Sequence, residues 1–205
     1  MKNLASPMKR LCAFVIDALI FSNLELLFFS QITATSDLPV ILDGILSFVL
    51  LVLFGGFVYS LINVGLTVKF GGSVGKLLTG LEVVNAEEKK ISFWRAVLRN
   101  HVGYFASGLL VWMGFVWILK DKEHRGWHDL LADTYVVSKS NSGAFVGILA
   151  ALALLFTNGY FVVTIITQIN TNVPMYRQVF EEIKTDLSPT PTPDKPLRDM
   201  VEFDK

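Results

Sequence analysis

The segment from Gly143 to Ile169 contains no charged side chain. As a helix it would be about 40 Å long, and a bilayer core needs only about 20 apolar residues. Three further stretches are comparably apolar: residues 11–32, 40–68 and 102–119. The first two span a bilayer with ease, whereas 102–119 is borderline in length. The pattern predicts an all-α membrane protein with three or four transmembrane helices.

Composition also favours a lipid environment. Of the 205 residues, 52% are hydrophobic and 18% are charged, whereas a soluble domain usually has about 25% charged residues. Lys and Arg number 18, as do Asp and Glu, so no basic field would attract nucleic acid. Cys12 is the only cysteine, which excludes an internal disulfide and a thiolate metal cluster.

The N-terminal apolar stretch is expected to be a retained helix and not a signal peptide. It contains Asp17 and Glu25 and continues beyond the short apolar core of a signal. The chain then divides into a transmembrane domain over residues 1–139, an additional transmembrane helix over 140–169, and a Pro-rich, largely disordered polar tail over 170–205. A short helix over 175–184 is the only structure expected in that tail.

Basic residues set the expected orientation. Lys2, Lys9 and Arg10 precede the first helix, the 33–39 connection has no Lys or Arg, and the 69–101 segment is rich in both. By the positive-inside rule, the N-terminus and residues 69–101 are expected to be cytoplasmic in a multi-pass cell-membrane protein.

Two short segments resemble each other and predict a pair of strands. Residues 77–84 and 130–137 each have two leucines, a brief break and a Val-Val ending. If they pair, they form a small two-stranded cap on the cytoplasmic side, and the chain between them must return to the side it left. Residues 91–100 would then be an interfacial helix and 102–119 a re-entrant hairpin. A plain third span is the alternative, and it would place the tail in the cytoplasm instead of outside.

Asp17 is the most informative single residue, because a charged group inside a spanning helix is costly and needs a partner or a water-filled cavity. It is interpreted either as a proton or cation site or as a buried polar contact that orients helices. Arg10 shares its helix face but lies about 10 Å away along the axis, too far for a direct pair. Glu25 is a secondary candidate.

Two motif-like stretches are interpreted as structural. Residues 70–77 resemble a phosphate loop, but Phe70 and Leu77 stand where a glycine and a Ser or Thr are required. His124 and His128 have metal-ligand spacing without further ligands, so no metal or cofactor is expected. No nucleophile and base can be paired, so the chain is not expected to be an enzyme.

Three blocks resemble the RDD family of membrane proteins. They are Ala5-Ser6-Pro7-Met8-Lys9-Arg10-Leu11-Cys12-Ala13-Phe14-Val15-Ile16-Asp17, then Gly71 to Val84 followed by Ser92 to Asn100, and Arg125-Gly126-Trp127-His128-Asp129-Leu130-Leu131-Ala132-Asp133-Thr134-Tyr135-Val136-Val137. The resemblance implies a mostly bacterial cell-membrane protein of unassigned activity. Transport has been proposed for the family, and sodium/proton exchange is reported for some relatives.

The family's arginine and two aspartates fall on Arg10, Asp17 and Asp129. Asp133 departs from the glycine that is usual there. We expect Arg10 to contact Asp129 and pin the cap to the first helix, and exchange of the two charges to restore stability. The remaining charged residues in or near these blocks are weaker candidates: Glu25, Lys76, Arg99, Arg125 and His128.

Two function classes follow. One is a small transporter or cation/proton exchanger, with Asp17 binding the ion and the subunits associating into a homo-oligomer to complete a pathway. The other is a non-transporting membrane adaptor or scaffold, in which the charged trio is structural. Both have the lipid bilayer as a partner, and only the first requires a small cation ligand.

Overall fold

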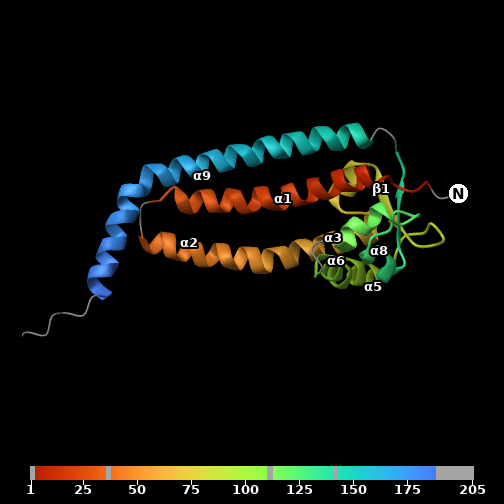
Figure 1. Cartoon of the computed structure of the whole chain (residues 1–205), viewed down its shortest axis with the longest axis horizontal. Helices are drawn as coiled ribbons and strands as arrows, with labels where there is room; N and C mark the ends of the chain where they lie inside the picture. The colour runs from red at the N-terminus through yellow and green to blue at the C-terminus, as the bar shows by residue number, and fades with distance from the viewer. Residues whose placement is uncertain (1–2, 36–37, 110–112, 141–142, 188–205) are drawn as a thin grey trace, which may run out of the picture.

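Three long helices dominate the molecule, and a compact cap covers one end of them (Figure 1). The computed structural model describes residues 3–35, 38–109, 113–140 and 143–187. Helix α1 (Pro7–Thr33) leads away from the cap. The chain returns as one helix made of α2 (Leu38–Leu50), the π-helical turn η1 (Leu51–Gly55) and α3 (Gly56–Phe70). Helix α9 (Gly143–Leu187) then runs away from the cap beside α1.

These three helices are long and apolar enough to cross a membrane. Most of their large apolar side chains are exposed, as is usual for surfaces that face lipid. Polar side chains instead join α1 to α9: the Asn23 amide donates to the Leu154 carbonyl at 3.0 Å, and the Asn158 amide to the Ser22 hydroxyl at 2.9 Å. Such bonds between helices tie a bundle together in lipid.

The predicted pair of strands is confirmed. Strand β1 (Leu81–Val84) pairs antiparallel with β2 (Tyr135–Ser138), with Val83 opposite Val136. The N-terminal segment lies beside β2, where the Ala5 amide donates to the Val136 carbonyl at 2.9 Å. Buried Val83, Val136 and Ala5 join the apolar core of the cap. The two strands therefore lie at the same end of the bundle.

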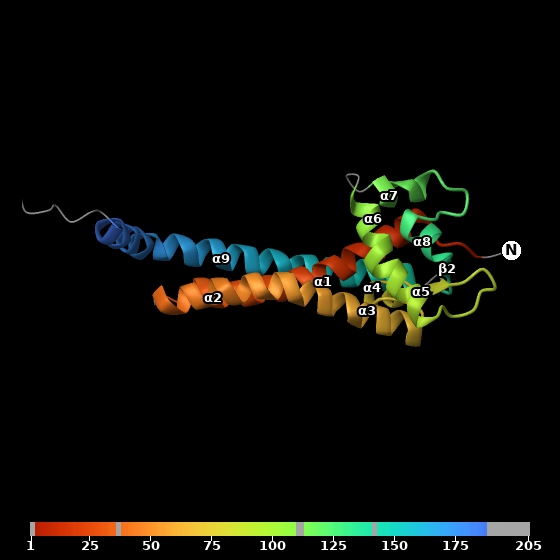
Figure 2. The ribbon, with the colours of Figure 1, turned by 90° about the horizontal axis from the view of Figure 1, so that it is seen from below.

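The segment between the strands doubles back. It consists of α5 (Phe93–Val97), the π-helical η2 (Leu98–Gly103), α6 (Tyr104–Leu109), α7 (Met113–Val116) and the 3₁₀ turn η3 (Trp117–Leu119). Its two limbs bend by 108° relative to each other. They touch at Gly114, where a Cβ would lie 2.5 Å from the Cα of Ser107. This bent pair, called the hairpin below, clusters with the cap (Figure 2). A bend of this size fits the predicted re-entrant segment and also a broken span across the membrane.

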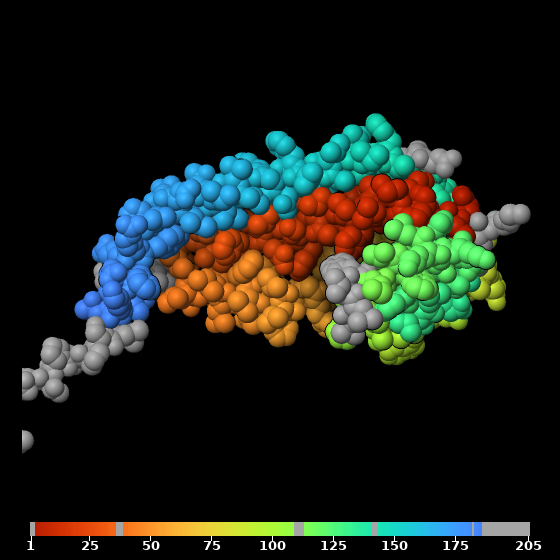
Figure 3. Space-filling view, in the orientation of Figure 1, coloured from red at the N-terminus to blue at the C-terminus, as the bar shows by residue number. Residues whose placement is uncertain are grey.

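Two short helices complete the cap. Helix α4 (Val74–Leu78) packs on α1, and α8 (Trp127–Ala132) packs on η2. Figure 3 shows the cap against one end of α1, with α9 along α1 and α2 on its other side.

Helix α9 is longer than the predicted 143–169 span. It contains Pro174 and continues to Leu187, so helix also covers 170–187, where only a short helix over 175–184 was expected. Its far end lies opposite the end that carries the N-terminus (Figure 1). The Pro-rich stretch, residues 188–193, lies outside the described residues.

Candidate functional site

Asp129 is the centre of a buried charged cluster in the cap. Its carboxylate is fully buried in the first turn of α8 and contacts two arginines from different elements. Arg10 of α1 donates from Nη2 to Oδ2, and Arg99 of η2 donates from Nη2 to Oδ1 at 2.8 Å and from Nε at 3.1 Å. Arg99 is 1% exposed. The expected contact between Arg10 and Asp129 is therefore present, and Arg99 shares the same carboxylate.

Residues close to Asp129 in the sequence also bind its carboxylate. The Gly126 amide donates to its Oδ2 at 3.0 Å, as in one half of a capping box, and Thr134 Oγ1 lies 3.4 Å from Oδ1. Burial alone would raise the pKa of the Asp129 carboxyl, but the Arg10 and Arg99 guanidinium groups outweigh burial and hold that pKa well below its usual range. Asp129 is therefore ionised at neutral pH.

His128 fills the space beside the ion pairs. Its Nε2 lies 3.3 Å from Arg10 Nη2 and 3.3 Å from Asp129 Oδ2, and its Nδ1 lies 3.2 Å from Ser107 Oγ. Burial lowers the pKa of His128 to about 3 against the raising effect of the Asp129 charge, and the Arg99 and Arg10 charges act in the same direction as burial. His128 is therefore neutral at physiological pH and completes the cluster by hydrogen bonding without adding a charge.

Asp17 lies apart from this cluster and holds α4. Ser73 donates its hydroxyl to Oδ2 at 2.5 Å, and the Gly75 amide donates to Oδ1 at 2.8 Å. Lys76 Nζ donates to the same Ser73 oxygen at 3.1 Å. Gly75 lies so close to α1 that a Cβ there would be 2.0 Å from the Ala13 carbonyl oxygen. These contacts agree with the interpretation of Asp17 as a polar contact that orients helices.

A cavity of about 780 Å³ lies beside α1, between α3 and the hairpin. Asp17 lines it, so the orienting contact does not remove this carboxylate from the cavity wall. The other charged side chains in its lining are Arg10, Glu25, Lys76 and Arg99. Along α1 the lining extends from Pro7 to Glu25, about 27 Å at 1.5 Å per residue. The cavity thus connects the cap with the apolar depth of the bundle.

Glu25 is the second carboxylate in the lining of this cavity. Its side chain is half-buried within the α1 span, and among the described residues it has no ion-pair or hydrogen-bond partner. It lies eight residues beyond Asp17, about 12 Å deeper along the helix. Sequence reasoning ranked it below Asp17, because only the structure shows that Asp17 is already bonded and Glu25 is not.

The weaker candidates fall into two groups. Lys76, Arg99 and His128 lie in the cavity wall or the charged cluster. Arg125 lies outside both, where it pairs with Glu123 at 2.7 Å and packs over the Tyr135 ring. Within the described ranges, no three His, Cys, Asp or Glu side chains come together as a metal site would require.

The departure at Asp133 has a backbone explanation. Asp133 ends α8 in the left-handed region at φ 48°, which glycine adopts freely and aspartate tolerates better than most residues. Its carboxylate lies 3.7 Å from Arg95 at the surface. Asp133 therefore adopts the backbone conformation of this turn in place of the usual glycine.

Some site residues carried no usable signal in the sequence. Ser73 and Gly75 belong to the stretch that resembles a phosphate loop, and their true partner is a carboxylate 56 and 58 residues earlier in the chain. Ser107 sits in an apolar stretch with nothing to mark it.

Comparison with known proteins identifies the family to which the chain is similar. The model of the RDD family matches residues 4–133, more than half of the chain, and so runs from the segment before α1 through β1 to the end of α8, stopping just before β2. An uncharacterized protein of Bacillus subtilis (strain 168), YxaI, is 35% identical over 71 residues. That match spans 35% of this chain and about half of the relative, 46% of its length. No solved structure matches the chain.

Proposed function

Because this chain belongs to the RDD family of membrane proteins, we propose that it is a small cation transporter that exchanges its cation for protons through the cavity beside α1. The observation that carries the proposal is the depth of that cavity. One continuous wall runs from Arg10 at the cap to Glu25 within the apolar span, and it carries carboxylates at two levels. Ionisable groups inside a spanning segment are costly and typically mark ion or proton pathways.

The two carboxylates have different roles in this proposal. Glu25 has no partner among the described residues, so it is the group that can take up a cation or a proton. Asp17 already accepts two hydrogen bonds from the α4 region. Competition for those bonds would couple ion occupancy to the contact between α4 and α1.

The charged cluster closes the cap end of the cavity. Arg10 and Arg99 line the cavity and are both held by Asp129. We place this end in the cytoplasm of a cell-membrane protein, because the basic residues gather there. The far end of α9 is then extracytoplasmic.

The alternative function is that of a non-transporting membrane adaptor. It is favoured by one observation: Arg10, Arg99 and Asp129 satisfy one another in a buried site, as purely structural groups would. In that case the cap is a docking surface, and the cavity carries no flux.

Proton flux in sealed proteoliposomes distinguishes the two functions. Sodium, potassium, lithium or tetraethylammonium is added outside vesicles that hold a pH-sensitive dye, and the internal pH is followed. The transporter proposal expects cation-dependent flux that Asp17→Asn and Glu25→Gln each reduce in folded protein. Absence of flux with every cation, from intact and oriented protein, overturns the proposal and favours the adaptor.

A further inference from the structure

We propose that the deep half of the cavity binds an organic cation, a molecule with one positive head and an apolar or aromatic body. This inference rests on the cation site of the proposed function and names its substrate class. It is carried by the size of the cavity, by the side chains around Glu25 and by the distribution of charge along the wall.

The cavity is large for a bare alkali ion. Its volume of about 780 Å³ lies in the range of small-molecule sites, about 300–1,000 Å³, which are mostly apolar with few polar groups. A hard metal cation instead requires a shell of oxygen ligands. Within four residues before Glu25 on α1, Ser22 carries the one side-chain hydroxyl of the lining, and it already accepts a hydrogen bond from Asn158 of α9 at 2.9 Å. The Tyr59 hydroxyl is directed to the Asp17 carbonyl.

Aromatic rings lie beside the free carboxylate. Phe21 is one helical turn before Glu25, so both side chains are on the same face of α1. Its ring lies 5.3 Å from the Tyr59 ring, measured between centroids. The Tyr59 hydroxyl donates to the Asp17 carbonyl at 3.0 Å, which fixes that ring in place. A cation over such rings gains cation–π attraction in addition to its pairing with a carboxylate.

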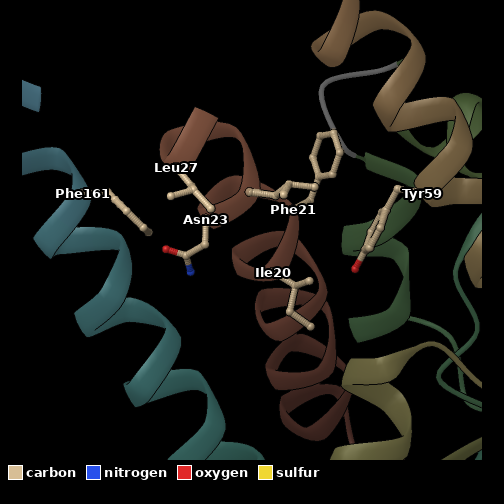
Figure 4. A pocket seen from close by; sticks show the side chains of 7 residues that line it. Ile20, Phe21, Asn23, Leu27, Tyr59 and Phe161 are labelled. Atoms are coloured by element: carbon tan, nitrogen blue, oxygen red, sulfur yellow. The ribbon is translucent and has the colours of Figure 1, made fainter. Parts of the chain in front are cut away.

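Figure 4 shows these rings from a neighbouring pocket that shares them. Phe21 and Tyr59 face each other between α1 and α3, while Asn23 points away toward Phe161 of α9. The two rings therefore lie on the α3 side of α1, whereas the Asn23 amide bonds to Leu154 of α9.

The charges along the wall orient such a ligand. At the cap end Arg10, Arg99 and Lys76 supply three positive charges against two negative charges from Asp129 and Asp17, a net of +1. Glu25 supplies −1 at the deep end. A positive head is therefore repelled from the cap and drawn to Glu25. A second aromatic group, Phe115 with Phe14 and Tyr104, lies toward the cap and can receive the apolar body.

Direct binding to the full-length protein in detergent tests the inference without requiring transport. Tetraphenylphosphonium and tetraphenylborate have the same shape and opposite charge, and each is titrated by calorimetry. We expect saturable binding of the cation and none of the anion. Glu25→Gln should weaken cation binding at least tenfold, and Phe21→Leu several-fold. Glu181→Gln, at an exposed carboxylate near the far end of α9, is the matched control and should leave binding unchanged.

Each outcome has one meaning for this inference. Binding of the anion in preference to the cation overturns it and indicates an anionic head at the cap end. Cation binding that Glu25→Gln and Phe21→Leu both leave unchanged, in variants that melt like the wild type, also overturns it. Sodium-driven proton flux without tetraphenylphosphonium binding rejects the inference and keeps the proposed function. Saturable, Glu25-dependent binding of tetraphenylphosphonium without any flux keeps the inference and rejects transport as the function.

Discussion

Arg10 of α1 and Asp129 of α8 form a buried ion pair across 119 residues of sequence. The pair joins the start of the first spanning helix to the cap, and Arg99 approaches the same carboxylate from η2. Three segments that are distant in the chain therefore meet at one buried charge. Removal of one partner from such a cluster typically costs about 3–5 kcal/mol, because a charge is left buried without compensation.

Exchange of the two charges should fail to restore stability. In the double variant Arg10→Asp with Asp129→Arg, the arginine introduced at position 129 would face Arg99 at the distance where Asp129 now accepts its hydrogen bonds. The sequence alone led to the expectation of rescue, because it did not show this second arginine. Thermal unfolding in detergent should give melting temperatures for the double variant no higher than for Asp129→Asn. Recovery to the wild-type value would show that Arg99 does not share the carboxylate.

Gly75→Ala should loosen the contact between α4 and α1. The new Cβ would lie 2.0 Å from the Ala13 carbonyl oxygen, so the two elements must move apart. Overpacking of this kind typically costs about 1–3 kcal/mol. Gly65→Ala is the control, because a Cβ at Gly65 meets nothing within 4 Å and alanine favours helix. The melting temperature should fall for Gly75→Ala only, and an equal effect of the two variants would contradict the packing.

Acid should destabilise the cap through His128. Its pKa is about 3 in the folded protein against 6.5 when unfolded, so below pH 6.5 only the unfolded state gains the proton. Stability is therefore full above pH 6.5 and falls as pH drops from there, by up to about 1.4 kcal/mol per pH unit. Melting temperatures between pH 7.5 and 4.5 should depend on pH less steeply in His128→Gln. Equal slopes in the two proteins would contradict the assignment.

The hairpin should place two exposed lysines on opposite sides of the membrane. Lys89 lies in the loop after β1, and Lys184 lies near the far end of α9. In a Cys12→Ser background, Lys89→Cys and Lys184→Cys are labelled with a membrane-impermeant maleimide in intact cells and after permeabilisation. We expect Lys184→Cys to react in intact cells and Lys89→Cys only after permeabilisation. Reaction of both on the same side would mean that residues 102–119 cross the membrane.

The large features of the fold could be predicted because lipid leaves few solutions. Long uncharged stretches must be helices, and two similar short segments such as 77–84 and 130–137 satisfy their backbones by pairing. The contact between Arg10 and Asp129 could also be predicted, because pairing of those segments brings Asp129 toward the start of the first helix.

Other features depend on geometry that one sequence does not reveal. The partners of Asp17 come from a loop that only the folded cap presents to α1. The importance of Glu25 appears only when the other carboxylates are seen to be bonded. The extension of α9 to Leu187 was missed because its polar residues resemble a solvated tail, although amphipathic segments of that kind also form helix at an interface.

If Glu25, which has no hydrogen-bond or ion-pair partner among the described residues, carries the transported cation, Glu25→Gln should abolish transport. Cation-driven proton flux is measured in proteoliposomes for the wild type, for Glu25→Gln and for the control Glu181→Gln at equal protein and equal orientation. We predict that flux is lost in Glu25→Gln, with an unchanged melting temperature, and that it is kept in Glu181→Gln. Wild-type flux in folded Glu25→Gln would mean that Glu25 does not carry the transported cation.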